Sequence, residues 1–177
     1  GKLKFTKNFV NGLAEGDYVE YHDNGQVFYK CVFKKGKITG DVEYSDDDGK
    51  KYFVYSLDND IAKTAVYYDK TGKEVRRSER KSKRLDLTTY YPDGYKRSQA
   101  VYNDKGEING EETFYFRSGK ISTHSTYEDG KQTGESLSYY QNGKLHHSVS
   151  YVDGEKHGYE KYFFIHGQVE DEGWYQE

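Results

Sequence analysis

The sequence has very little of what builds a disulfide, a cysteine-rich metal site or an oily core. Its 177 residues include one cysteine, one proline, one tryptophan and no methionine, and only 33% are hydrophobic. A lone cysteine excludes an intrachain disulfide and a cysteine-based zinc site. No apolar run is long enough to cross a membrane as a helix, and no signal segment is recognisable, so the compartment stays open.

The chain also has no large excess of positive or negative charge. The 27 basic and 30 acidic residues nearly balance, which disfavours a nucleic-acid partner. Nor is there a glycine-rich phosphate loop, a nucleophile elbow or a carboxylate pair with a supporting base. We therefore predict a protein that is not an enzyme and that has no cofactor.

The histidines and the acidic residues do not form a recognisable metal site either. His146 and His147 are adjacent, so they should point to opposite faces of a strand. The acidic run 46–48 does not have the spacing of an EF-hand loop and is more typical of an acidic turn. We predict no metal site.

Glycine and tyrosine, by contrast, are abundant and regularly placed. There are 19 glycines and 20 tyrosines. Eight glycines, which we call the register glycines, recur at steps of 22 to 25 residues: Gly1, Gly25, Gly49, Gly72, Gly94, Gly119, Gly143 and Gly167. A period of this length predicts an array of about seven short units, each stabilised chiefly by its neighbours.

Each period predicts two strands and two turns. Pairs such as Asn24-Gly25 and Asn142-Gly143 lie between aromatic-rich runs, which is typical of tight hairpin turns. Pairs such as Asn11-Gly12 and Asp153-Gly154 are interpreted as the longer return loops. Connections this short favour antiparallel neighbours. The sequence thus predicts an all-β fold, an elongated single-layer antiparallel meander of about fourteen or fifteen strands.

Alternation along the strands predicts which face packs. Positions two, four, six and eight after a register glycine are mainly apolar, as in Val27, Tyr29, Cys31 and Phe33. The residues between them are mostly polar and should face water. Cys31 is accordingly expected to be a buried small hydrophobe rather than a nucleophile.

The repeat pattern covers the chain unevenly. We expect one repeat domain over residues 1–177, with regular repeats at 1–49 and 106–177 and degenerate middle repeats at 50–105. Within the middle, four residues occupy positions that are apolar elsewhere: Glu74, Arg76, Ser78 and Arg80.

These four lie in or beside a basic run, residues 76–84, which has two interpretations. It can be a basic patch, with Arg76, Arg77 and Arg80 meeting an acidic partner or a phosphate. Alternatively, a one-residue slip turns Val75 inward and sends Arg76 out. We favour the slip, and whether residues 73–86 form a regular strand or a basic loop stays open.

The regular units resemble a known family. The unit at 134–158 reads GESLSYYQNGKLHHSVSYVDGEKHG, that is, G, an aromatic pair, xNGK, a hydrophobic residue, Y and DG. This pattern resembles MORN-type repeats, and more closely the bacterial MORN-variant class, over essentially the whole chain. The resemblance implies a β-hairpin repeat protein that acts by contact, and in this class an antitoxin or immunity role. In the wider MORN class it implies scaffolds, dimerisation modules or membrane-associated surfaces.

Aromatic residues three before the register glycines form the predicted contact surface: Tyr91, Phe116, Tyr140 and Phe164. Tyrosine offers large, stiff contact area at low entropy cost, although cross-strand packing would also use these rings. The predicted function is therefore a non-catalytic protein-binding scaffold of the antitoxin or immunity type with a toxin-like or effector-like partner. The alternative is a structural or membrane-associated scaffold that self-associates through its edge strands.

Overall fold

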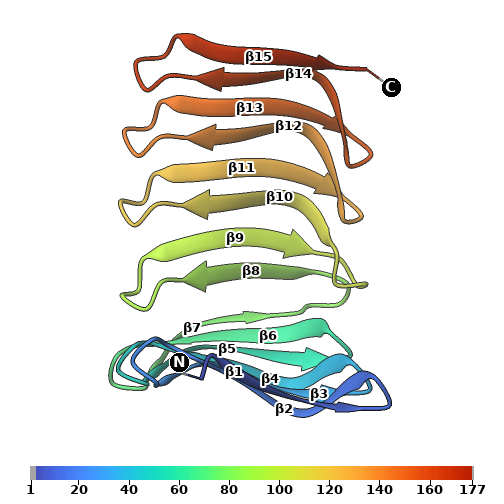
Figure 1. The fold of residues 1–177 in the computed structure, drawn as a ribbon, viewed down its shortest axis with the longest axis vertical. Coiled ribbons are helices and arrows are strands. Elements are labelled where there is room, and N and C mark those ends of the chain that lie inside the picture. Colours follow the sequence, from blue (N-terminus) through green and yellow to red (C-terminus); the bar gives the residue numbers. More distant parts are fainter. Residues whose placement is uncertain (1–2, 177) are drawn as a thin grey trace. The chain divides into compact units, whose positions relative to one another are not determined.

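The computed structural model describes residues 3–176 and confirms the all-β antiparallel meander (Figure 1). Its fifteen strands form two sheets, and in each sheet every strand pairs with its neighbours in the chain. The described residues contain no helix that could span a membrane. They also divide into two compact units, residues 1–85 with 92–94 and residues 86–91 with 95–177. The single repeat domain over 1–177 stays a prediction.

The first sheet contains β1 (Phe5–Val10), β2 (Leu13–Tyr21), β3 (Val27–Lys34), β4 (Lys37–Ser45), β5 (Lys51–Asp58), β6 (Ile61–Tyr68) and β7 (Glu74–Glu79). The second contains β8 (Leu85–Tyr90), β9 (Lys96–Tyr102), β10 (Ile108–Tyr115), β11 (Ile121–Glu128), β12 (Lys131–Tyr139), β13 (Leu145–Val152), β14 (Glu155–Phe163) and β15 (Val169–Tyr175).

The two kinds of turn are the reverse of those predicted. Asn11 and Gly12 both have positive φ, 50° and 77°, and join β1 to β2 directly, as a two-residue hairpin requires. At the register position only Gly25 has positive φ, while the His22 N–H bonds to the Gln26 carbonyl across a longer turn. The Asn24 side chain accepts the Gln26 N–H at 2.9 Å, which stabilises this longer turn.

A second glycine in most periods bends a strand instead of a turn. Gly40 has φ 74° within β4, and pairing with β3 shifts between Lys30 and Val32, so Cys31 faces more than one residue of β4. This is a β-bulge, which increases local twist. Each such glycine lies opposite the residue eight after a register glycine, in the pairs Gly16–Phe33, Gly40–Leu57, Gly110–Tyr127, Gly134–Tyr151 and Gly158–Tyr175.

Burial follows the predicted alternation in the inner strands, but Phe5 and Phe9, which the alternation also places on the packed face, are 55% and 62% exposed on the edge strand β1. Cys31 and Val149, both six after a register glycine, are only 3% and 2% exposed. The burial predicted for Cys31 is thereby confirmed. In β5 and β6 both faces are buried, because Val54 and Val66 lie directly opposite each other on the face away from Phe53.

The degenerate middle forms regular strands, and the predicted slip is wrong. Arg76 pairs with Tyr67 and Ser78 with Ala65, so both lie on the apolar face of β6. Val75 is on the other face and is exposed. The register is held by the turn at 69–73, where the Asp69 carboxylate accepts the N–H groups of Thr71 and Lys73. Residues 73–86 thus comprise β7, a tight bridge between Lys81 and Arg84, and the start of β8.

Candidate functional site

The four predicted contact aromatics lie in turns, just beyond the ends of their strands. The strands end at Tyr90, Tyr115, Tyr139 and Phe163, one residue before them. The Phe116 N–H then bonds to the Lys120 carbonyl at 2.8 Å and closes the turn. Tyr91, Tyr140 and Phe164 make the same backbone bond, so all four occupy equivalent turn positions in the second unit.

Two of these aromatics use their hydroxyls to join one repeat to the next. Tyr91 donates to the Tyr115 carbonyl at 3.1 Å, and Tyr140 donates to the Phe163 carbonyl at 2.7 Å. Phe164 has no hydroxyl, is 41% exposed and stacks on His166 at 5.3 Å. Of the four, Phe164 therefore presents its ring most openly, beside the exposed Ile165.

The three predicted arginines have separate local roles. Arg77 forms a bidentate pair with Glu74, at 2.8 and 2.6 Å, and this pair holds the pKa of the Glu74 carboxyl below its usual value. Arg80 donates from Nε to the Ala62 carbonyl at 2.9 Å and so ties the chain after β7 back to β6. Arg76 is exposed on the apolar face. Arg77 and Arg80 thus contact different partners.

An aromatic hollow in the first unit was not predicted from the sequence. Its volume is about 410 Å³, within the range of ligand pockets. It is lined by Lys7, Tyr18, Glu20, Phe28, Tyr29, Phe33 and Tyr44, from β1 to β4. Tyr29 contacts Tyr18 and Tyr44 edge to face, with centroids 5.7 and 5.0 Å apart, so the walls are packed rings. Burial raises the pKa of Tyr29, whose hydroxyl stays protonated.

Exposed aromatic surface continues from this hollow along β1. Phe5 and Phe9 lie on the same face as Lys7 and are 55% and 62% exposed. Phe5 stacks on Tyr18 at 6.0 Å. Contiguous apolar surface with a polar rim is typical of protein-interaction sites. We define the contact face as the hollow together with Phe5 and Phe9.

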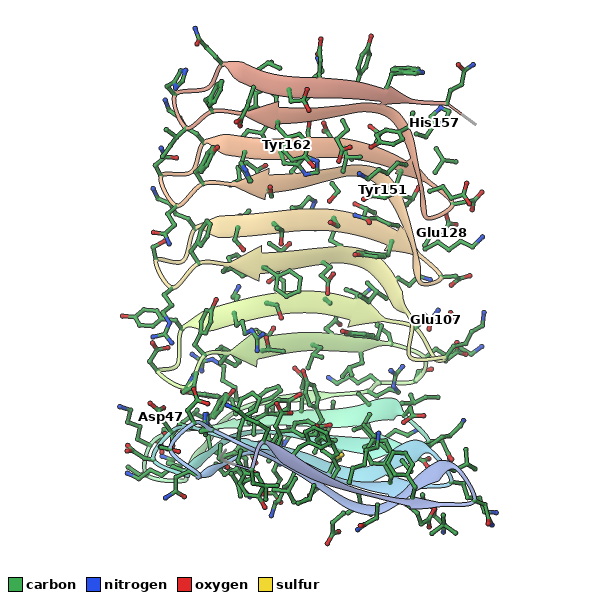
Figure 2. All side chains as sticks on the ribbon, viewed as in Figure 1. Asp47, Glu107, Glu128, Tyr151, His157 and Tyr162 are labelled. Atoms are coloured by element: carbon green, nitrogen blue, oxygen red, sulfur yellow. The ribbon has the colours of Figure 1, made fainter. Side chains whose placement is uncertain are left out.

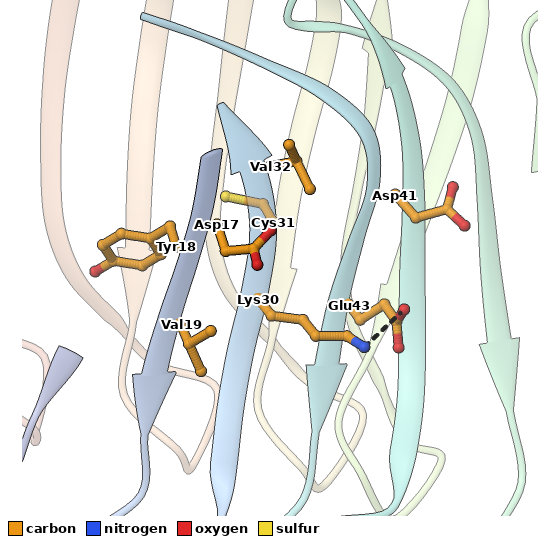
Figure 3. A pocket seen from close by; sticks show the side chains of 8 residues that line it. All are labelled: Asp17, Tyr18, Val19, Lys30, Cys31, Val32, Asp41 and Glu43. Carbon is orange, nitrogen blue, oxygen red and sulfur yellow. Dashed lines mark ion pairs between the residues drawn. The ribbon is translucent and has the colours of Figure 1, made fainter. Parts of the chain in front are cut away.

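A second hollow, of about 330 Å³, lies mainly on the opposite face of β2 to β4 and has a different character (Figure 3). Lys30 pairs with Glu43 at 3.2 Å, and the exposed Asp17 and Asp41 also line it. Among residues 3–176 no group of three or more His, Cys, Asp or Glu side chains is arranged to hold a metal ion. The charges of this hollow are partly paired and open to solvent.

The second unit contains a buried carboxylate, Glu160, whose side chain is only 8% exposed. It accepts hydrogen bonds from Lys156 Nζ at 2.7 Å, Tyr175 at 2.7 Å and Tyr162 at 3.3 Å, and His147 Nε2 lies 2.8 Å away. The Lys156 and Tyr175 hydrogen bonds lower the pKa of Glu160 to about 2. Figure 2 shows Tyr162 over the middle of the strands and Tyr151 nearer the two-residue hairpin at 153–154. A carboxylate this well satisfied joins strands and is a poor proton acceptor.

The repeating unit is now clear: a bulged strand, a register turn and a second strand with a buried central residue. The sequence model of the MORN repeat variant family matches residues 14–35, 108–129 and 132–153. Each match spans one such pair, β2–β3, β10–β11 or β12–β13, with Gly25, Gly119 or Gly143 in its turn. The chain contains MORN-variant repeats. It is thus a repeat scaffold whose surface is available for binding.

Comparison with whole proteins gives no further indication of function beyond the MORN-variant repeats. No curated protein matches the chain. Among the solved structures that match are two at 11% identity: a crystal structure of TarM, with TM-score 0.35, and one of an S. aureus TarM mutant in complex with Fondaparinux, alpha-GlcNAc-glycerol and UDP, with TM-score 0.36. The matches cover 53% and 67% of this chain but only 19% and 21% of those chains.

The contact face was missed because its signal lies in one repeat and not in the period. Lys7 occupies position six after a register glycine, where later repeats have Cys31 or Val149. A lysine at a position that is apolar in several other repeats was the feature of the sequence that could have indicated the contact face. The carboxylate at Glu160 could have been noticed in the same way, because the equivalent residue of β12, which also pairs with Val149, is the uncharged Ser136.

Proposed function

We propose that this MORN-variant chain is a non-catalytic, protein-binding scaffold of the antitoxin or immunity type, which acts by covering a partner protein. The partner is a toxin-like or effector-like protein, and the contact face of the first unit is its principal docking surface. The observation that carries the proposal is the exposed aromatic surface of β1 beside a packed aromatic hollow.

Physical arguments support this use of the contact face. Aromatic rings supply large contact areas at low entropy cost, and binding energy concentrates in a few such residues next to a desolvated pocket. Phe5 and Phe9 are exposed anchors, and the hollow behind them accepts a protruding side chain. The polar groups Lys7 and Glu20 in the same hollow provide orientation.

The turn aromatics form a second, smaller surface in the second unit. Phe164, Ile165 and Val169 are 41%, 56% and 48% exposed around one turn. The hydroxyls of Tyr91 and Tyr140 donate hydrogen bonds to neighbouring repeats, which favours a structural role for these two residues. Arg76, Arg77 and Arg80 remain proposed contacts for an acidic part of the partner.

The test has two steps. The purified chain is used to capture proteins from a lysate of its native host, beside a Phe5→Ser/Phe9→Ser variant and a Tyr140→Ala/Phe164→Ala variant. Each captured protein is then expressed alone and together with the chain. We expect one partner whose expression arrests growth, rescue by the wild-type chain, and loss of both capture and rescue in the Phe5→Ser/Phe9→Ser variant.

Two results would contradict the proposal. If both variants captured the partner as well as the wild type does, the aromatic surfaces would not be part of the interface. A captured protein that does not inhibit growth would remove the antitoxin role and leave a general scaffold.

Self-association is the second candidate, and β1 favours it. All six residues of β1 are exposed, and among the described residues β1 pairs only with β2. A free strand edge can pair with another chain. Sedimentation of the purified chain, with Thr6→Lys to place a charge on this edge and disfavour pairing, separates this candidate from the first.

A further inference from the structure

The ammonium group of Lys7 lies inside a cage of aromatic rings. Its Nζ is 4.7 Å from the ring centroid of Phe33, 5.3 Å from that of Phe9 and 5.8 Å from that of Tyr18. These distances are within the range at which the negative face of a ring attracts a cation. The rings come from three successive strands, β1, β2 and β3. We call them the cation cage.

Two of the three rings, those of Tyr18 and Phe33, are fixed by packing that does not depend on Lys7. Tyr18 and Phe33 contact each other edge to face, 6.1 Å apart at 76°, and Tyr18 also packs against Phe5 and Tyr29. Tyr18 lies opposite Lys7 in the ladder, and Phe33 lies opposite Gly16, which has no side chain to block its ring. The cage is therefore expected to persist when Lys7 withdraws.

Lys7 itself is held by little else. Its side chain is exposed, and in residues 3–176 no carboxylate oxygen lies within ion-pair distance of its Nζ. The residue sits on an edge strand that is exposed along its length. Moving this side chain into solvent breaks no ion pair, so the cage can exchange its occupant.

The hollow that the cage opens into also contains a negative charge. Glu20 lines it, and within the described part of the chain its carboxylate interacts only with the Tyr18 hydroxyl, at a long 3.4 Å. A carboxylate without an ion pair, among aromatic walls, is complementary to an incoming cation. The charge and the cage point to the same ligand chemistry.

We infer that this hollow is a cation-binding site that accepts a lysine ammonium of the partner protein, with Lys7 as the resident competitor. The inference deepens the proposed function and rests on it for the identity of the partner. A lysine is the expected ligand because the side chain that now occupies the cage, Lys7, is itself a lysine. The incoming ammonium takes the place of Lys7 against Tyr18 and Phe33, with Glu20 as its counter-ion.

The test uses small probes on the full chain. N-acetyl-lysine methylamide, its norleucine counterpart and tetramethylammonium are titrated separately while the ring resonances of Tyr18 and Phe33 are followed by NMR. The variants are Lys7→Ala, the same change combined with Glu20→Gln or with Phe33→Leu, and Lys34→Ala as a matched control on β3. Circular dichroism checks that each variant is folded.

We expect Lys7→Ala to bind the lysine probe roughly five-fold or more tightly than the wild type, because the competitor is gone. Lys34→Ala should bind it as the wild type does, and adding Glu20→Gln or Phe33→Leu should reverse the gain. If Phe33→Leu does not fold, Glu20→Gln alone decides the outcome, since this isosteric change is made at a half-buried residue with no ion pair within residues 3–176.

Three outcomes would overturn the inference. Lys7→Ala can fail to bind the lysine probe, or it can bind the norleucine probe equally well, which would make the hollow merely apolar. Binding of tetramethylammonium without the lysine probe would assign the cage to a quaternary ammonium headgroup instead. Since no partner protein is present in the titration, its failure is distinguishable from a failure to find a toxin.

Discussion

The two sheets share one repeat but stabilise its central row in different ways. In the first sheet the buried residues are apolar and lie among rings: Cys31, Val42, Phe53 and Ala65. In the second, the row combines the buried apolar residues Ala100 and Val149 with the buried Ser125 and Glu160, and both of these polar side chains have hydrogen-bond partners. The glycines and turns determine the backbone, so the row tolerates either chemistry provided that every buried polar group is satisfied. Five perturbations would break or sharpen this comparison.

The largest effect is expected for Phe53→Ala in the first sheet. Phe53 is 4% exposed and contacts Tyr55 edge to face at 4.7 Å. Its truncation leaves a cavity and should lower the free energy of unfolding by about 3–5 kcal/mol. Urea unfolding followed by circular dichroism measures the change. Trp174, the single tryptophan, reports on the second unit, and its fluorescence midpoint should move less. Equal shifts of both midpoints would contradict independent stabilisation.

Glu160→Gln should have the next largest effect, in the other sheet. The amide cannot attract Lys156 and leaves His147 and Tyr175 without a charged acceptor. A loss of about 2–3 kcal/mol is expected, less than for a fully buried pair because Lys156 is 37% exposed. Glu172→Gln is the matched control, since its pair with Lys161 is on the surface and should be worth about 0–1 kcal/mol. Equal losses would show that burial of Glu160 does not matter.

The same carboxylate predicts how stability depends on pH. The pKa of Glu160 is about 2 in the folded chain, below its ordinary value of 4.5. Its contribution is therefore complete above pH 4.5 and is lost as the pH falls towards 2. We expect the difference in unfolding free energy between wild type and Glu160→Gln to shrink by about 2 kcal/mol over this range, after allowance for solvent screening. A constant difference would mean that Glu160 is not the titrating group.

Exchanging the residues six after a register glycine tests the two chemistries directly. Cys31→Ser buries a hydroxyl among rings and should cost about 1–3 kcal/mol. Ser125→Cys weakens the bonds to Ser136, at 2.8 Å, and Gln132, at 3.1 Å, and should cost about 1 kcal/mol. Chemical denaturation of both variants gives the comparison. If both substitutions were neutral, the central row would not distinguish the sheets.

The fold was predictable because its signal repeats. Each register glycine and each apolar alternation appears several times, so a local error does not change the architecture. The turn types were reversed because Asn24-Gly25 and Asn11-Gly12 look alike in sequence, while only the second has both residues at positive φ. The register at Arg76 could not be foreseen either, because the adjoining Asp69 turn, and not burial of Val75, fixes it.

The candidate site was much less predictable. The predicted aromatics were chosen by period, whereas the cation cage depends on departures from it. Lys7 is a lysine at an apolar position, and Phe9 is left exposed because β1 has one neighbour among the described strands. Which rings surround a cation follows from strand register and bulges, which sequence spacing alone does not give.

The effect of the bulge glycines should be the most uniform, since it comes from the backbone alone. Gly40 and Gly134 have φ of 74° and 67°, and an added Cβ would meet no atom within 4 Å in either case. Alanine at each position should cost about 1–2 kcal/mol through left-handed strain, equally in the two sheets. Gly173→Ala is the control, because Gly173 also has open space but no positive φ, so this substitution should be neutral or slightly stabilising. Midpoints from thermal unfolding would rank the three variants. A larger cost in one sheet would mean that the bulges are not interchangeable and that the central row influences backbone geometry as well as packing.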